Sequence, residues 1–154
     1  MSVFWLSLSI CVALLYALLM GPRWRRRRFN RELGRARQRF HLRREWLEAK
    51  FVDLAQQSGR PRGLIWADVD FENTESLARD RHTNQLQALV GITIRFEAIP
   101  GGPMEHVEAV GNLRAATAVF GFEQGEWKTS GRAIFNLSPD EAIKHLEGEL
   151  ETVE

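Results

Sequence analysis

The sequence predicts an α+β protein that is attached to a membrane by one N-terminal helix. Three observations predict this class: an uncharged apolar run from Ser2 to Met20, a helical repeat of apolar residues over 29–57, and strict alternation over 86–98. They divide the chain into a transmembrane anchor (1–22), a basic juxtamembrane amphipathic helix (23–57), and an antiparallel β-meander of four to five strands with a C-terminal helix packed on the sheet (58–154).

The first segment has the length of a membrane span. A helix of the 19 residues from Ser2 to Met20 would be about 28 Å long, close to the hydrocarbon thickness of a bilayer. Trp5 and Trp24 would then lie at the two interfaces, where tryptophan is enriched. A cleaved signal peptide is the alternative, but it requires positive charge before the apolar core and a small-x-small site after it. Neither is present, so we expect an uncleaved signal-anchor.

Positive charge after the span predicts its orientation. The residues that carry it are Arg23, Arg25, Arg26, Arg27 and Arg28. Because such a cluster resists translocation, we expect a single-pass topology with the N-terminus outside and residues 23–154 in the cytoplasm.

Charge also divides the rest of the chain. Residues 21–44 contain eleven arginines and one acid, for a net charge of +10, whereas residues 45–154 contain ten basic and nineteen acidic residues, for a net charge of −9. Beside a membrane, the basic segment is expected to bind anionic lipid. The predicted membrane contacts are Trp5, Arg23, Trp24, Arg25, Arg26, Arg27 and Arg28. Nucleic-acid binding through these arginines is the alternative, but the acidic remainder would repel a polyanion.

Residues 29–57 are predicted to form one long amphipathic helix. Its apolar residues step by threes and fours, with one gap of seven at Arg43 or Arg44: Phe29, Leu33, Ala36, Phe40, Leu47, Phe51 and Leu54. Trp46 would widen this face. The heptad spacing 33, 40, 47, 54 permits a homo-oligomer through this helix, but Arg43 and Lys50 occupy the other seam position. We therefore expect the helix to pack on its own sheet.

The sheet is expected to begin after the break at 58–63. Over 64–71, Ile65, Ala67, Val69 and Phe71 alternate with a polar face formed by Trp66, Asp68, Asp70 and Glu72. A second, shorter strand is expected over 76–80. In the next strand the apolar row occupies even positions: Leu86, Ala88, Val90, Ile92, Ile94, Phe96 and Ala98. That row should face the core without a bulge at Gly91.

The last third predicts a hairpin and a helix. Residues 105–110 fit a short edge strand or an irregular turn equally well. The hairpin pairs 113–122 with 126–137 across a turn at Gln124 and Gly125. Ser138, Pro139 and Glu141 then have the spacing of an N-cap, a first-turn proline and a capping box. The buried stripe of the helix that follows should comprise Ile143, Leu146, Leu150 and Val153.

Few residues suggest chemistry. Cys11 is the only cysteine and lies in the apolar run, so thiol nucleophiles and zinc–thiolate sites are excluded from the rest of the chain. Asp68, Asp70 and Glu72 share one strand face, but a strand spaces them about 7 Å apart, too far to enclose a cation as a calcium loop does. Of four scattered histidines, only His106 has a carboxylate near it in sequence, at Glu108. We therefore expect no catalytic residue, no metal and no cofactor.

One arginine falls on each of three expected strands, at Arg95, Arg114 and Arg132. If the strand register places them on one face, they could bind an anion such as a carboxylate or phosphate. The ordinary alternative is cross-strand pairing with Glu97, Glu123 or Glu126.

The order of elements resembles that of cystatin-like and nuclear-transport-factor-like rolls, in which a long helix precedes a curved sheet. The functional hypothesis is a membrane-anchored, non-catalytic binding or scaffolding module that acts on an unidentified protein partner. The alternative is a small-ligand-binding domain or enzyme with its pocket between the sheet and the long helix. Apolar filling of that space would favour the first hypothesis, and a polar cavity holding His or Asp would favour the second.

Overall fold

The computed structural model describes residues 31–59 and 63–153. The chain divides into two compact units, Met1–His41 and Leu42–Glu154. Residues 31–42 are helical. The second unit contains, in order, α2 (Arg44–Gly59), β1 (Leu64–Asp80), β2 (Leu86–Ala98), the 3₁₀ helix η2 (Glu108–Gly111), β3 (Arg114–Glu123), β4 (Glu126–Phe135), α3 (Pro139–His145) and β5 (Leu150–Thr152). The predicted α+β class is confirmed.

The predicted span Ser2–Met20 lies outside the described residues. Within 31–59 and 63–153, no helix combines the length and the apolar character that crossing a bilayer requires.

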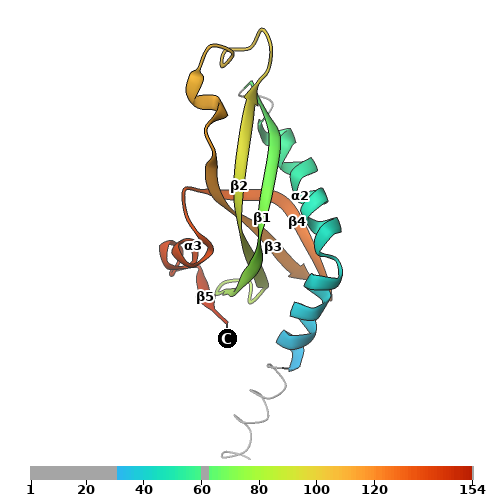
Figure 1. Ribbon diagram of the computed structural model, residues 1–154. Coiled ribbons are helices and arrows are strands. Elements are labelled where there is room, and N and C mark those ends of the chain that lie inside the picture. Colours follow the sequence, from blue (N-terminus) through green and yellow to red (C-terminus); the bar gives the residue numbers. More distant parts are fainter. Residues whose placement is uncertain (1–30, 60–62, 154) are drawn as a thin grey trace, which may run out of the picture. The chain divides into compact units, whose positions relative to one another are not determined.

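The five strands form one antiparallel sheet in the order β4-β3-β2-β1-β5. The first four strands make the predicted meander, and β5 pairs with the end of β1 at Ala78, Arg79 and Asp80. The sheet curls, and α2 lies along it in contact with both β4 and β1 (Figure 1). The helix α2 therefore covers one face of the sheet and contacts strands that are not adjacent in it.

The predicted single helix is interrupted, because Arg43 is a turn residue between helical residues 31–42 and α2. The gap in the apolar stripe falls at the same place, where Arg43 and Arg44 stand at the positions that would continue the stripe. The Arg43 guanidinium carbon lies 5.6 Å from the ring centroid of Trp46. Trp46 is 56% exposed and so does not widen the buried face. The stripe itself is confirmed by the burial of Leu33, Ala36, Phe40, Leu47 and Phe51.

The core beneath α2 is built around Phe51. Its ring centroid lies 5.8 Å from that of Phe71, 5.8 Å from that of Phe120 and 6.1 Å from that of Trp66. The helix α2 packs closely on β4 at Gly131, where φ is +75° and an added Cβ would lie 2.7 Å from the Ala55 amide nitrogen. Glycine is required there for both its backbone conformation and its lack of a side chain.

The strands expected over 64–71 and 76–80 are a single strand, β1, with irregularities between Trp66 and Asp68 and between Phe71 and Glu75. The extra residue at the first irregularity reverses the alternation. Trp66 is therefore buried and Ile65 is 42% exposed, the opposite of the prediction, whereas the assignment of Phe71 to the inner face is correct.

The predicted phase of β2 is confirmed. Ala88, Val90, Ile92 and Ile94 are at most 2% exposed, while Thr93 is exposed. Pairing of β2 with β3 continues through Gly91 without a shift. On the opposite face, Leu89 is also fully buried, because it belongs to a second cluster with Ala78, Ala142, Ile143 and Leu150. The sheet is thus covered on both faces.

The C-terminal helix is shorter than expected. Its capping box is confirmed: the Ser138 hydroxyl accepts from the Glu141 N–H, and Glu141 Oε2 accepts from the Ser138 N–H at 2.9 Å. However, α3 ends at His145, and Leu150 lies in β5 rather than on the helix. Leu150 is buried in the cluster of Leu89 all the same. The open edge of β1 supplies backbone partners that a continued helix could not use, so the strand forms.

Candidate functional site

The membrane-contact residues predicted from sequence lie outside the described residues. They are Trp5, Arg23, Trp24, Arg25, Arg26, Arg27 and Arg28.

The strand register does not bring the three candidate arginines together. Arg114 is opposite Ile94 and therefore shares the face that α2 covers. Arg95 is the next residue in β2 and lies on the other face, opposite Asp68. Arg132 lines a groove with Gln87 and Val119 on the face of Leu89. The three arginines therefore do not form a single anion-binding site.

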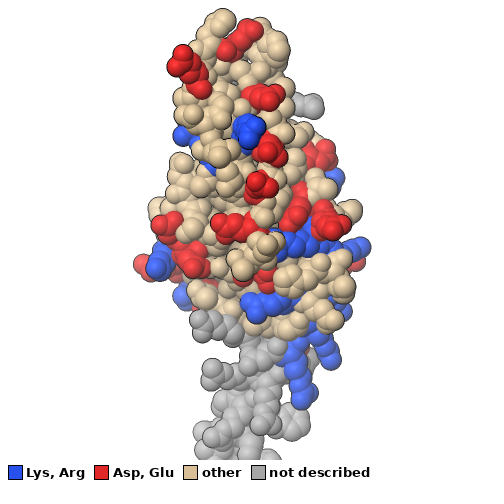
Figure 2. Space-filling view, viewed as in Figure 1, with Lys and Arg blue, Asp and Glu red and all other residues tan. Residues whose placement is uncertain are grey.

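The acidic residues are dispersed as well. Asp68, Asp70 and Glu72 are exposed, and the second irregularity of β1 moves Glu72 over Gly91, where its carboxylate fills the space of a side chain. Figure 2 shows acidic side chains spread over the surface in view rather than gathered at one point. In residues 31–59 and 63–153, no three His, Cys, Asp or Glu residues are close enough to hold a metal ion.

The histidine that has a carboxylate near it in sequence, His106, forms no acid–base pair in the described residues. His106 and Glu108 are both exposed, and no hydrogen bond joins their side chains. His82 contributes through its backbone: its N–H and that of Thr83 donate to Asp80 Oδ1 at 2.9 and 2.8 Å. These bonds, led by that of Thr83, hold the pKa of Asp80 below its ordinary value. The arrangement is a turn rather than a reactive site.

The space between α2 and the sheet is filled by apolar side chains. Leu47, Phe51 and Ala55 from α2 and Phe120 and Ile94 from the sheet have no exposed surface. In the described part of the chain, no buried side-chain nitrogen or oxygen lacks a hydrogen-bond partner. This space therefore has the character of a core and not of a ligand cavity.

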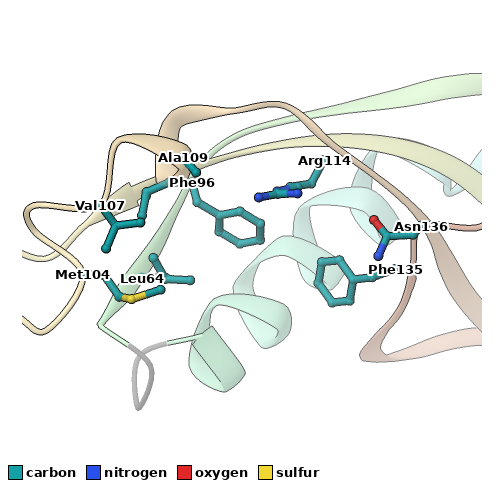
Figure 3. Close-up of a pocket in the computed structure, with 9 residues that line it drawn as sticks. Leu64, Phe96, Met104, Val107, Ala109, Arg114, Phe135 and Asn136 are labelled. Atoms are coloured by element: carbon teal, nitrogen blue, oxygen red, sulfur yellow. The ribbon is translucent and has the colours of Figure 1, made fainter.

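A cavity of about 300 Å³ opens at one end of the same sheet face. We call it the end pocket. Side chains from β1, β2, the loop before β3, β3 and the end of β4 line it: Leu64, Phe96, Met104, Val107, Ala109, Val110, Arg114, Phe135 and Asn136. Figure 3 shows the rings of Phe96 and Phe135 on either side of an open space, with Met104, Val107 and Ala109 on the loop that precedes β3. The end pocket is mainly apolar and accessible to solvent.

Aromatic rings connect the end pocket to the core. Trp66 is 5.4 Å from Phe96 and 6.3 Å from Phe135 between ring centroids, and Phe96 and Phe135 are 6.4 Å apart. Trp66 in turn packs against Phe51. The inner wall of the pocket therefore rests on rigid core packing.

Arg114 supplies the one charged side chain among the lining residues. Figure 3 shows its guanidinium extending from β3 toward Phe96. Within the described residues, its side chain has no ion pair or hydrogen bond. Asn136, held at φ +60° as its N–H donates to Ala115 O, places an amide on the same rim. The pocket thus combines apolar walls with donors at its edge.

A second groove, of about 350 Å³, lies on the opposite face and is polar. Two of its charged groups are paired: Lys128 Nζ is 3.4 Å from Glu123 Oε2. The Gln85 amide, followed by Lys128, holds the pKa of Glu123 below its ordinary value. Because its polar groups already bind one another, this groove is the weaker candidate for a ligand site.

Among the predicted anion-binding residues, only Arg114 lies in the end pocket. The other lining residues were not predicted, although one signal was available. Met104, Val107, Val110 and Leu113 are apolar residues in a segment with no strand alternation, which is unusual for an exposed loop.

The chain matches no protein-family model, and neither a search of curated proteins nor a search of solved structures found a significant match.

Proposed function

We propose that this protein is a single-pass, membrane-anchored, non-catalytic binding module whose ligand site is the end pocket. The anchor rests on the apolar run Ser2–Met20 and the arginines that follow it. In this proposal the N-terminus is outside, the basic segment binds anionic lipid, and the α+β domain lies on the cytoplasmic side.

The proposal that the protein is a binding module rests on the end pocket. Its inner wall rests on core packing, its lining is mainly apolar, its volume of about 300 Å³ is at the lower end of ligand sites, and it holds donors without a nucleophile or general base. Apolar side chains fill the space beneath α2, which argues against the alternative of a pocket between the sheet and the long helix. Burial of Leu47 and Phe51 within the chain also leaves α2 no free seam for a homo-oligomer.

The anchor is tested by the topology of the full chain in cells. A tag placed after Glu154 should be protected from protease added to intact cells. Replacing Arg25, Arg26, Arg27 and Arg28 with glutamine should weaken that orientation, because the charges resist translocation. Digestion of the tag on the unmodified protein would contradict the cytoplasmic assignment.

The binding half is tested by native mass spectrometry of the full chain released from nanodiscs. A non-covalently bound species should be lost in Ala109→Trp, which fills the pocket from an exposed position, and retained in Ser130→Trp, which enlarges a side chain of the second groove. Retention in both variants, or release of a chemically altered species, would contradict a binding site in the end pocket.

A further inference from the structure

We infer that the end pocket binds a small apolar carboxylate, with the anionic group on Arg114 and the apolar group against Phe96 and Phe135. This inference rests on the proposed function and names the chemical class of its ligand.

Size limits the ligand first. One water molecule occupies about 30 Å³ of liquid water, so about 300 Å³ is the volume of roughly ten waters, which suits a small ligand. A molecule of that size carries one short chain or one aromatic ring in addition to its polar group. The lining residues lie in loops and at strand ends.

The walls specify an apolar body. Phe96, Phe135, Met104 and Val107 surround most of the opening (Figure 3). Phe135 and Val107 are each 42% exposed, so a ligand would cover apolar surface that is now in contact with water. Removing that surface from water favours an apolar ligand, and aromatic walls add favourable ring contacts.

Arg114 specifies the polar end. A guanidinium that lies beside apolar walls without a carboxylate partner has its donors available to a ligand. Its planar fork fits the two oxygens of a carboxylate, and the amide of Asn136 can donate to the same group. A phosphate monoester carries up to two charges and normally needs several cations, whereas the described residues that line the pocket include one, Arg114. A monoanionic carboxylate is therefore the matching group.

Arg132 provides a matched comparison within the same sheet. It lines the polar groove with Lys128 and Glu123, where apolar walls of this kind are absent. Substitution of Arg132 removes the same charge from the protein without touching the end pocket.

The experiment is calorimetric titration of the full chain in lipid nanodiscs with 3-phenylpropionate, and with 3-phenylpropanol as its neutral counterpart. We expect saturable binding of the acid, weakened about tenfold in Arg114→Gln. Binding of the acid to Arg132→Gln should match that of the unmodified protein. The alcohol should bind more weakly than the acid, with no difference between the unmodified protein and Arg114→Gln.

Two further outcomes separate this inference from the proposed function. If Ala109→Trp abolishes binding of both probes but Arg114→Gln changes neither, the end pocket is a binding site and the carboxylate assignment is wrong. If neither probe binds the unmodified protein in nanodiscs, the inference is overturned, while a native ligand lost in Ala109→Trp would still support the proposed function. If Arg114→Gln and Arg132→Gln weaken binding of the acid equally, the carboxylate inference is also contradicted, because net charge alone would then explain the binding.

Discussion

The core beneath α2 and the end pocket occupy the same face of one sheet, yet side chains fill only the first. Phe120 beneath α2 has no exposed surface, whereas Phe135, on the neighbouring strand, is 42% exposed. The segments that cover the two regions differ. The helix α2 packs over Phe120, whereas the end pocket is lined by loop residues before β3 that leave it open to solvent.

The comparison teaches where binding is possible in a small domain. A core closed by a helix gives stability, and the uncovered end of the same face can take a ligand without loss of that core. The two regions are connected through Trp66, which packs against Phe51 on one side and against Phe96 and Phe135 on the other.

The largest expected effect comes from placing a charge in the filled region. Ile94→Asp puts a carboxylate at a position with no exposed surface and should cost about 5 kcal/mol, enough to unfold a domain of ordinary stability. Thr93→Asp, on the exposed side of the same strand, should be nearly silent. Thermal unfolding of the full chain measures both, and equal shifts would mean that the face assignment of β2 is wrong.

A pair of phenylalanines compares the two regions directly. Phe120→Ala should cost about 4 kcal/mol, as expected for a fully buried ring, whereas Phe135→Ala should cost about 1 kcal/mol because much of its surface is already exposed. Denaturant unfolding of the two variants gives both values. If Phe135→Ala costs as much as Phe120→Ala, the end pocket is not open in solution.

The contact between α2 and β4 should be sensitive to a single methyl group. Gly131→Ala introduces strain at φ +75° and overlap with the backbone of Leu54 and Ala55, for a cost of about 3 kcal/mol. Gly121→Ala is the control, since its nearest neighbour is the flexible end of Gln85 at 3.6 Å. Equal stabilities of the two variants would show that α2 lies farther from β4 than the structure has it.

The smallest effect should come from the cap of α3, away from both regions. Two bonds from Ser138 hold the pKa of Glu141 below its ordinary value of 4.5. Its contribution to stability is therefore complete above about pH 4.5 and is lost as the pH falls through the lowered pKa. Glu141→Gln should flatten the dependence of the free energy of unfolding on pH in this range. Ser138→Ala should cost about 1 kcal/mol at neutral pH. An unchanged acid profile in Glu141→Gln would contradict the capping role.

Sequence patterns predicted the elements whose local and tertiary preferences agree. The even-numbered row of β2 and the capping box of α3 are examples, since each is specified by its own residues. Patterns failed where the conformation of a segment depends on a distant part of the chain. Ala67 is an extra residue only in relation to β2, so the reversed phase at Ile65 and Trp66 could not be predicted from alternation. Leu150 has the spacing of a helix but joins the free edge of β1.

The candidate site was less predictable than the fold for the same reason. Arg114 was a candidate, but its face depends on its pairing with Ile94. The end pocket brings Leu64, Phe96, Val107 and Phe135 together from segments that are far apart in sequence. Strand pairing and the tertiary arrangement of the sheet and the loop make them neighbours, and no single segment carries that information.

The central claim is that ligand binds at the uncovered end of the sheet face and not beneath α2. Amide hydrogen exchange of the full chain in nanodiscs, with and without saturating 3-phenylpropionate, tests this most directly. The account predicts slower exchange confined to residues 104–114 and to the amides around Phe96 and Phe135. Protection that appears instead in α2 and in the strands beneath it, with none in residues 104–114, would contradict it.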